Sequence, residues 1–141
     1  MDVAGKVVAI TGGARGIGLA TASAFARRGA LVAIGDLDAA GARVAAEGIG
    51  RNAIGLALDV TDRASFESFL SEVEHRLGPL DVMVNNAGIQ HLGLFGDESD
   101  ASTDIQVAVN LGGVLTGTKL ALARMGPRGR GLCGLLVRVS I

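Results

Sequence analysis

The sequence predicts an α/β domain in which helices cover both faces of a doubly wound parallel sheet, and two observations support this. Short apolar runs alternate with amphipathic stretches, and Gly and Asp mark the breaks between them. The first run, residues 7–10, is apolar at every position, as in a strand buried on both faces of a sheet. Strands that alternate with crossover helices pair in parallel, and right-handed crossovers place the helices on both faces.

The first half of the chain supplies three strands and two helices. We expect strands at residues 7–10, 31–34 and 54–58. A helix over residues 15–28 would turn Ile17, Ala20, Ala24 and Phe25 towards the sheet and stop at Gly29. A weaker helix is expected at residues 39–46, because glycines interrupt and end it.

The second half supplies two more helices and two more strands. Apolar residues recur at spacings of three and four in the clearest helix, with Asp62 as its cap and Gly78 as its stop: Phe66, Phe69, Leu70, Val73 and Leu77. Strands are expected at residues 80–84 and 135–139. A long helix over residues 103–125 lies between them, and Gly112 and Gly113 predict a local distortion in it.

Composition narrows the class of protein. A chain of 141 residues, 49% of them hydrophobic, fits one domain over residues 1–141. Thirteen basic and fourteen acidic residues give a net charge of −1, which argues against nucleic acid or an anionic membrane as partner. Cys133 and two histidines form no metal-ligand pattern, so no metal is expected. Without a secretory signal or an apolar run of about 18 residues, we expect a cytoplasmic protein with no membrane partner.

The turn after the first strand, Thr11-Gly12-Gly13-Ala14-Arg15-Gly16-Ile17-Gly18, favours a phosphate site. Glycine lets the backbone approach a pyrophosphate closely, and the helix that follows offers unpaired N–H groups. The expected contacts are Gly12, Arg15, Gly16, Ile17 and Gly18. Glycines also serve close packing of a helix on a strand, so the cluster alone does not decide between the two functions.

Asp36, at the end of the second strand, favours a dinucleotide. Its carboxylate could accept hydrogen bonds from ribose hydroxyls and would repel a 2′-phosphate, which favours NAD over NADP. Arg15 could instead pair with that phosphate, but a desolvated like-charge contact costs more than an exposed ion pair gains. The alternative for Asp36 is a plain turn or cap residue.

Four separated motifs resemble the short-chain dehydrogenase/reductase family. The turn matches its Thr-Gly-x-x-x-Gly-x-Gly pattern, Asp59-Val60 matches the pair after the third strand, and Asn85-Asn86-Ala87-Gly88 matches the element after the fourth. Asn110 falls where the family places an asparagine in its long fourth helix. The resemblance implies a Rossmann-like fold with about five strands and four helices, and an NAD-dependent oxidoreductase that moves hydride between nicotinamide and an alcohol or ketone.

The resemblance also implies roles for these residues. Asp59 and Val60 would hold the adenine ring, although Asp59 could equally cap the next helix. Asn86 would steady the cofactor turn, and Ala87 and Gly88 would leave room for the nicotinamide ribose. Asn110 is the one expected catalytic residue: it would free a helix carbonyl to hold a water of the proton relay, its alternative being a polar residue on a helix face.

The resemblance weakens after Met125. Segment 126–141 fits the family poorly and reads as an irregular tail, and Ser140 lies only next to the family's catalytic serine position. The chain has no tyrosine, so the family's Tyr-x-x-x-Lys proton donor is not in it. We therefore expect the cofactor-binding half of such an enzyme, truncated at its C-terminal part by a genuine ending or a shifted reading frame. Sequencing the gene beyond Met125 in three frames tests this.

Two functions remain open for such a half domain. In the first, the half domain is inactive alone and acts on its substrate, a small alcohol or ketone, only when the missing half is supplied. In the second, it is a non-catalytic NAD-binding module. Self-association through the fourth helix is expected in either case, because apolar residues along it would be left uncovered: Val107, Leu111, Val114, Leu115, Leu120 and Leu122.

Overall fold

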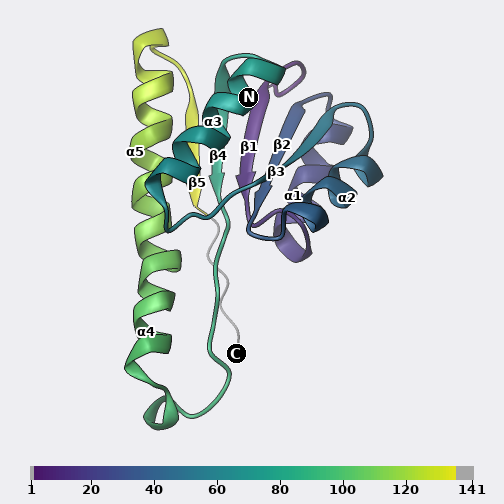
Figure 1. Cartoon of the computed structure of the whole chain (residues 1–141). Coiled ribbons are helices and arrows are strands. Elements are labelled where there is room, and N and C mark those ends of the chain that lie inside the picture. Colours follow the sequence, from purple (N-terminus) through teal and green to yellow (C-terminus); the bar gives the residue numbers. More distant parts are fainter. Residues whose placement is uncertain (1, 136–141) are drawn as a thin grey trace.

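A computed structural model describes residues 2–135 and shows three layers, with helices on both sides of one parallel sheet (Figure 1). The strands lie in the order β3-β2-β1-β4-β5. Their bounds are β1 (Val7–Thr11), β2 (Leu31–Asp36), β3 (Ala53–Ala57), β4 (Leu80–Asn85) and β5 (Leu132–Leu135). The helices are α1 (Gly16–Arg27), α2 (Ala39–Ile49), α3 (Arg63–Leu77), α4 (Asp100–Val107) and α5 (Val114–Met125). The expected doubly wound parallel sheet is confirmed.

Alternate residues of the strands feed two separate cores. Val8 and Ile10 of β1 face α1 and α2, whereas Val7 and Ala9 face α3 and α5. This alternation follows from the two-residue period of a strand. Of the α3 residues expected to point inward, Phe66, Phe69, Leu70 and Val73 are buried, and Leu77 packs against the same core while half-buried. Asp62 caps α3 as expected, its side chain accepting from the Ala64 N–H at 2.9 Å.

The inward face of α1 differs from the expected one. Ile17 is 52% exposed, and the buried residues of α1 are Gly18 and Ala22. The helix approaches the sheet most closely at its smallest residues, since a Cβ on Gly18 would collide with the backbone of the glycine turn. Phe25, expected on the inward face, is half-buried and does pack against this core. Close approach decided the orientation of α1, where the apolar pattern had indicated Ile17, Ala20, Ala24 and Phe25, the first three of which are exposed.

α2 runs further than expected, through Gly48 to Ile49. Its buried alanines, Ala42, Ala45 and Ala46, pack against the sheet, and this burial offsets the roughly 1 kcal/mol that a helical glycine costs relative to alanine. The helix ends instead at Gly50, whose φ of +107° few other residues adopt.

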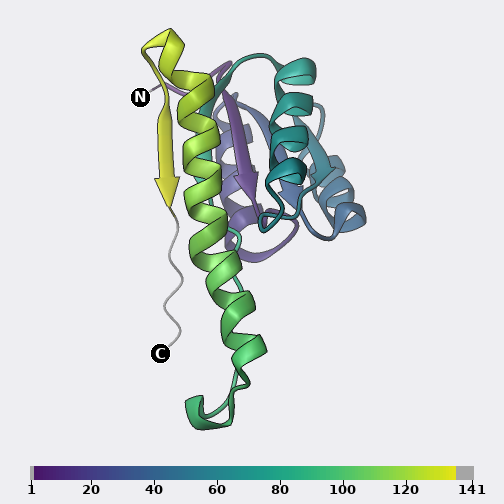
Figure 2. The same ribbon diagram turned by 60° about the vertical axis from the view of Figure 1, so that its left-hand side comes forward.

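The long helix is distorted where the two glycines predicted it. A π-helical segment, Ala108–Gly113, joins α4 to α5, so the helix continues with a local change of pitch. Figure 2 shows α4 extending beyond the sheet, while α5 lies along it. Residues 100–128 form a helix long and apolar enough to cross a membrane by length and composition. However, α5 buries Leu120, Ala121 and Met125 in the domain, as a core helix does.

β5 begins three residues earlier than the expected strand. It spans Leu132–Leu135 and pairs with β4, with Cys133 opposite Met83. The short turn after α5 places β5 here, because Gly129 has a left-handed φ of +62° that reverses the chain at once. Segment 126–135 is therefore partly regular, and the rest of the expected strand and Ser140 lie outside the described residues.

Candidate functional site

The carboxyl ends of β1, β2 and β4 meet at the point where strand order reverses. Connections leave β1 towards β2 on one side, while β4 lies on the other, and ligands of doubly wound sheets bind at such a point. The turn after β1 begins there with Gly12, whose N–H donates to the Gly35 carbonyl at 2.7 Å. Gly12 has a φ of +65°, and a Cβ on it would lie 2.7 Å from the Ala87 Cα. Glycine at position 12 thus lets two loops touch.

Thr11 and Asn86 tie the turn to the loop after β4. The Thr11 hydroxyl accepts from the Asn86 N–H at 3.0 Å and from the Ala87 N–H at 2.9 Å. The Asn86 side chain donates in return to the carbonyls of Thr11 and Gly12, both at 2.9 Å. Thr11 is only 2% exposed, so water cannot replace its hydroxyl as the acceptor of these two hydrogen bonds. Asn86 therefore lies between the two loops, as expected.

Thr11 was not among the residues expected to matter individually. Its signal in the sequence was a polar residue closing an otherwise apolar strand, a position where a buried hydroxyl needs a hydrogen-bond partner.

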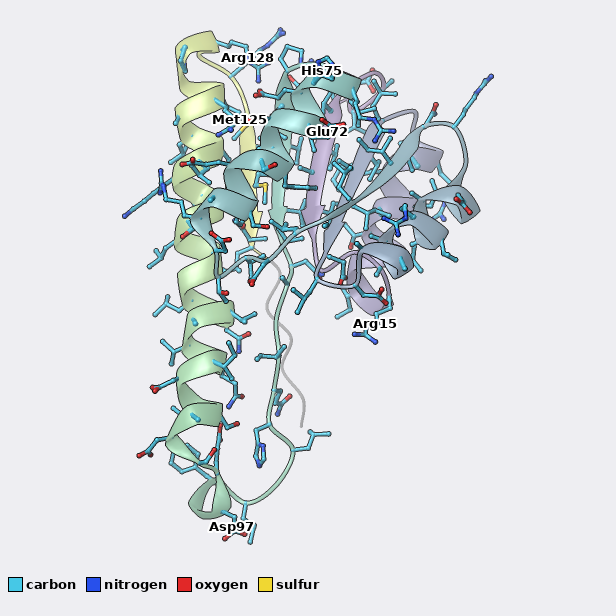
Figure 3. All side chains as sticks on the ribbon, viewed as in Figure 1. Arg15, Glu72, His75, Asp97, Met125 and Arg128 are labelled. Atoms are coloured by element: carbon cyan, nitrogen blue, oxygen red, sulfur yellow. The ribbon has the colours of Figure 1, made fainter. Side chains whose placement is uncertain are left out.

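The far half of the turn is open and leads into α1. Gly16 has a φ of +57°, and no atom lies within 4 Å of where its Cβ would be. Gly18 is the opposite case, since a Cβ there would collide with the Gly12 carbonyl and the Asn86 amide. Arg15 and Ile17 are exposed, and Figure 3 shows Arg15 at this end of the sheet with its side chain directed outward. The free N–H groups that open α1 suit an anion.

Asp36 faces the same turn from the end of β2. Its Oδ2 accepts from the Ala14 N–H at 3.0 Å, and its Oδ1 accepts from the Asp38 N–H at 3.1 Å. A carboxylate has about four acceptor positions, so two remain for a ligand's hydroxyls. The side chain is half-buried, and no guanidinium or ammonium pairs with it within residues 2–135. A negative charge therefore borders the turn.

Asp59 and Val60 follow β3. The Asp59 Oδ1 accepts from the hydroxyl of Thr61 at 2.6 Å and from its N–H at 2.9 Å. The Thr61 hydroxyl bond and, next, the Thr61 N–H bond lower the pKa of Asp59 below its usual 3.8, although partial burial opposes them. Asp59 does not cap α3, because Asp62 does. Val60 is buried and packs against Gly113 of the π segment. A Cβ added to Gly113 would lie 2.8 Å from a methyl carbon of Val60.

Asn110 lies in the π segment and pins the loop after β4. Its Oδ1 accepts from the Ile89 N–H at 2.9 Å, and its Nδ2 donates to the Ile89 carbonyl at 2.8 Å. Gly88 passes close by, since a Cβ on it would lie 3.3 Å from the same Oδ1. The structure thus brings Asn110 to the loop after β4, while its expected part in a water relay stays a prediction.

A hollow of about 460 Å³ opens between this loop and α4. Its lining includes Gln90, His91, Glu98, Gln106 and Asn110. The main-chain N–H of His91 donates to Gln106 Oε1 at 3.0 Å, and the Gln106 side-chain amide donates to the Glu98 carboxylate. A larger groove lies elsewhere, between α1 and α2, and meets the glycine turn only at Ala14. Residues 2–135 contain no group of three or more His, Cys, Asp or Glu side chains placed to hold a metal ion.

Comparison with known proteins decides the family. The family model described as short chain dehydrogenase matches residues 6–140. The chain belongs to the short-chain dehydrogenase family. Members of this family bind a nicotinamide dinucleotide. The match continues through segment 126–140, so the family likeness extends beyond Met125, where the motifs alone had weakened.

Individual relatives support the same conclusion. The chain is 41% identical over 131 residues to a sorbitol dehydrogenase of Cereibacter sphaeroides, covering 93% of this chain and 51% of that protein. It is 40% identical over 132 residues to the 2,5-dichloro-2,5-cyclohexadiene-1,4-diol dehydrogenase LinX of Sphingobium indicum, covering 92% and 53%. A solved short-chain dehydrogenase from Novosphingobium aromaticivorans superposes with a TM-score of 0.84 at 34% identity, covering 90% of this chain and 48% of that one. This chain thus spans about half the length of these relatives.

Proposed function

We propose that this chain binds NAD in preference to NADP and is the cofactor-binding half of an oxidoreductase acting on an alcohol or ketone. The observation that carries the preference is the Asp36 carboxylate, which lies beside the glycine turn with two acceptor positions free and no cation paired with it among the described residues. Ribose hydroxyls would donate to it, whereas a 2′-phosphate would be repelled.

The residues divide the binding among them. The open backbone at Gly16 and the first N–H groups of α1 would hold the pyrophosphate. Asp59 and Val60 would border the adenine, with Asp59 Oδ2 facing no donor among the described residues. Ala87 and Gly88 would border the nicotinamide ribose. When bound, NAD supplies a hydride acceptor, and this chain's part is to fix its position.

Calorimetric titration of NAD and NADP against the whole chain tests this proposal. NAD should bind more tightly than NADP, and Asp36→Asn should narrow or reverse the difference. Glu47→Gln is the matched control, because it removes one exposed carboxylate on α2 away from the turn. Tighter NADP binding by the unaltered chain, or no heat with either nucleotide, would refute it.

Turnover separates the two forms of the proposal. We expect these 141 residues to bind NAD without reducing it in the presence of secondary alcohols, because the chain has no tyrosine to act as proton donor. If adding a second polypeptide restores dehydrogenase activity, the chain is half of an enzyme. If the chain binds NAD and no added polypeptide restores activity, a non-catalytic NAD-binding module is favoured. Steady NADH formation by the chain alone would contradict both forms of the proposal, because each takes the chain alone to be inactive.

We also propose that the chain self-associates through the long helix in the cytoplasm. Val107, Leu111, Leu115 and Leu122 recur at spacings of four and seven and are all exposed. Of the residues first expected on this surface, Leu120 is instead buried against the sheet. Sedimentation should show a dimer or larger species that Leu111→Ser with Leu115→Ser dissociates, while Leu37→Ser, at an even more exposed leucine outside the long helix, does not. A monomer at high concentration, or co-sedimentation with lipid vesicles, would overturn the proposal.

A further inference from the structure

A groove of about 930 Å³ runs between α1 and α2, on the face of the sheet opposite α5. Its walls are mainly apolar and come from both helices, through Leu19, Ala26, Val44, Ala45 and Ile49. Ser23 and Asn52 add two uncharged polar side chains to the lining. Gly41 and Gly48 also line it, and nothing lies within 4 Å of where a Cβ on Gly48 would be. Val44 is 68% exposed along this groove. An apolar surface of this kind in a concave site is typical of a ligand pocket.

Among the described residues, Arg27 and Arg51 are the only charged ones that line the groove. Arg27 ends α1, and Arg51 follows the end of α2, so both lie at the end of the groove far from the cofactor turn. The ion pairs among residues 2–135 all involve other arginines, namely Arg63, Arg76, Arg124 and Arg128. No side-chain hydrogen bond of Arg27 or Arg51 occurs within that span either. Two guanidinium forks therefore stay available at one end of an apolar groove.

Arg27 also complements the negative end of the α1 dipole, but that interaction acts at a distance and leaves its N–H donors free. Within residues 2–135 no Asp or Glu lines the groove, so no negative side chain of that part of the chain would repel an anionic group there. Guanidinium groups bind carboxylates through paired hydrogen bonds. The charge pattern therefore matches a ligand with one anionic head and an apolar body.

We propose that the groove between α1 and α2 binds an acyl carboxylate, with its head between Arg27 and Arg51 and its chain over Val44 and Leu19. From Gly41 to Ile49 the helix wall extends about 12 Å at 1.5 Å per residue, which suits a chain of medium length. The volume lies in the roughly 300–1,000 Å³ range of small-molecule pockets. A second protein copy would need about 800 Å² per partner and is the less fitting occupant.

Decanoate, titrated into the whole chain below its micelle concentration and followed by amide NMR, tests the proposal. Saturable shifts are expected at the α1 and α2 amides, such as those of Ser23 and Ala45, with little change along α3. Arg27→Gln and Arg51→Gln should each weaken binding roughly two- to fivefold, as loss of an exposed ion pair does. Val44→Ser should weaken it as well, by removing apolar contact.

The controls are Arg43→Gln and 1-decanol. Arg43 is an exposed α2 arginine next to Val44 that does not line the groove, so its loss should leave decanoate affinity unchanged. The neutral alcohol should bind several-fold more weakly than decanoate. Equal affinity for the two amphiphiles, equal effects of the Arg43 and Arg27 substitutions, or α1 and α2 shifts that follow protein concentration instead of decanoate would overturn the proposal. The last result would indicate a second copy in the groove.

Discussion

The two ends of the loop after β4 differ sharply in how they are held. At its start, Asn86 and Ala87 make four partly buried hydrogen bonds with Thr11 and Gly12. At its far end, the loop and α4 leave the sheet, and α4 contains no buried residue (Figure 1). Figure 3 shows Asp97 at the outer tip of this arm, residues 89–107.

This difference indicates that buried hydrogen bonds hold the cofactor end, whereas the arm has few buried contacts. The glycine turn is fixed by hydrogen bonds that join Thr11 and Gly12 to the loop after β4. Asn110 bonds the start of the arm, and Gln106 joins its two sides internally through the His91 N–H, while Leu92, Leu94 and Phe95 are exposed. Substitutions at the cofactor end should therefore cost more than substitutions in the arm, and the following predictions test that order.

The largest effect is expected for Gly18→Ala. The added Cβ would collide with backbone at Gly12, which cannot move without breaking the turn, so about 3 kcal/mol of the free energy of unfolding should be lost. NAD affinity should fall with it. Thermal unfolding and calorimetry measure the two effects. Gly48→Ala serves as control, since it adds the same methyl group to open space in α2 and should be neutral or slightly stabilising. If Gly18→Ala and Gly48→Ala lower the stability equally, close contact at Gly18 does not make the cofactor end the more sensitive region.

Thr11→Val should be next. The valine keeps the shape of threonine but leaves the N–H groups of Asn86 and Ala87 without their acceptor, which costs about 2 kcal/mol. Thr11→Ser keeps the hydroxyl and should retain most of the stability. Chemical denaturation of both variants measures this, and a valine variant as stable as the serine variant would show that the hydroxyl does not join the loops.

A smaller and local effect is expected for Asn110→Ala. Both lost bonds go to Ile89 at the solvent-exposed start of the arm, so the free energy of unfolding should fall by only about 1 kcal/mol. Hydrogen exchange should speed up at Ile89 and through residues 89–99, but not at Asn86. Exchange that also accelerates at Asn86 would mean that the arm and the cofactor end open together.

The same contrast explains what the sequence could predict. The apolar period located the sheet, α3 and the glycine turn, because these depend on local pattern and on side chains that follow a strand directly. It misplaced the inward face of α1 and the end of α2, where close contact at Gly18 and buried alanines decide the packing. It also set β5 too late, since pairing with Met83 and the turn at Gly129 fix that strand. The bonds from Thr11 and Asn110 join residues 75 and 21 positions away, beyond the reach of any local pattern.

The smallest effect is expected at Asp59, in the loop after β3, and it depends on pH. Thr61→Val removes the hydroxyl that most lowers the Asp59 pKa, so the pKa should rise towards 3.8 while the backbone bond remains. A lowered folded-state pKa adds stability above the unfolded value, and that stability is lost as pH falls through the folded pKa. The unaltered chain should therefore be slightly more stable than the variant above about pH 4, and the difference should vanish in stronger acid. Carboxyl NMR titration and denaturation from pH 2 to 7 measure this, with Thr61→Ser as the control that keeps the hydroxyl. A pKa unchanged in the valine variant would assign the shift to the backbone N–H of Thr61, so that the main chain alone, without the Thr61 hydroxyl, would stabilise the Asp59 carboxylate.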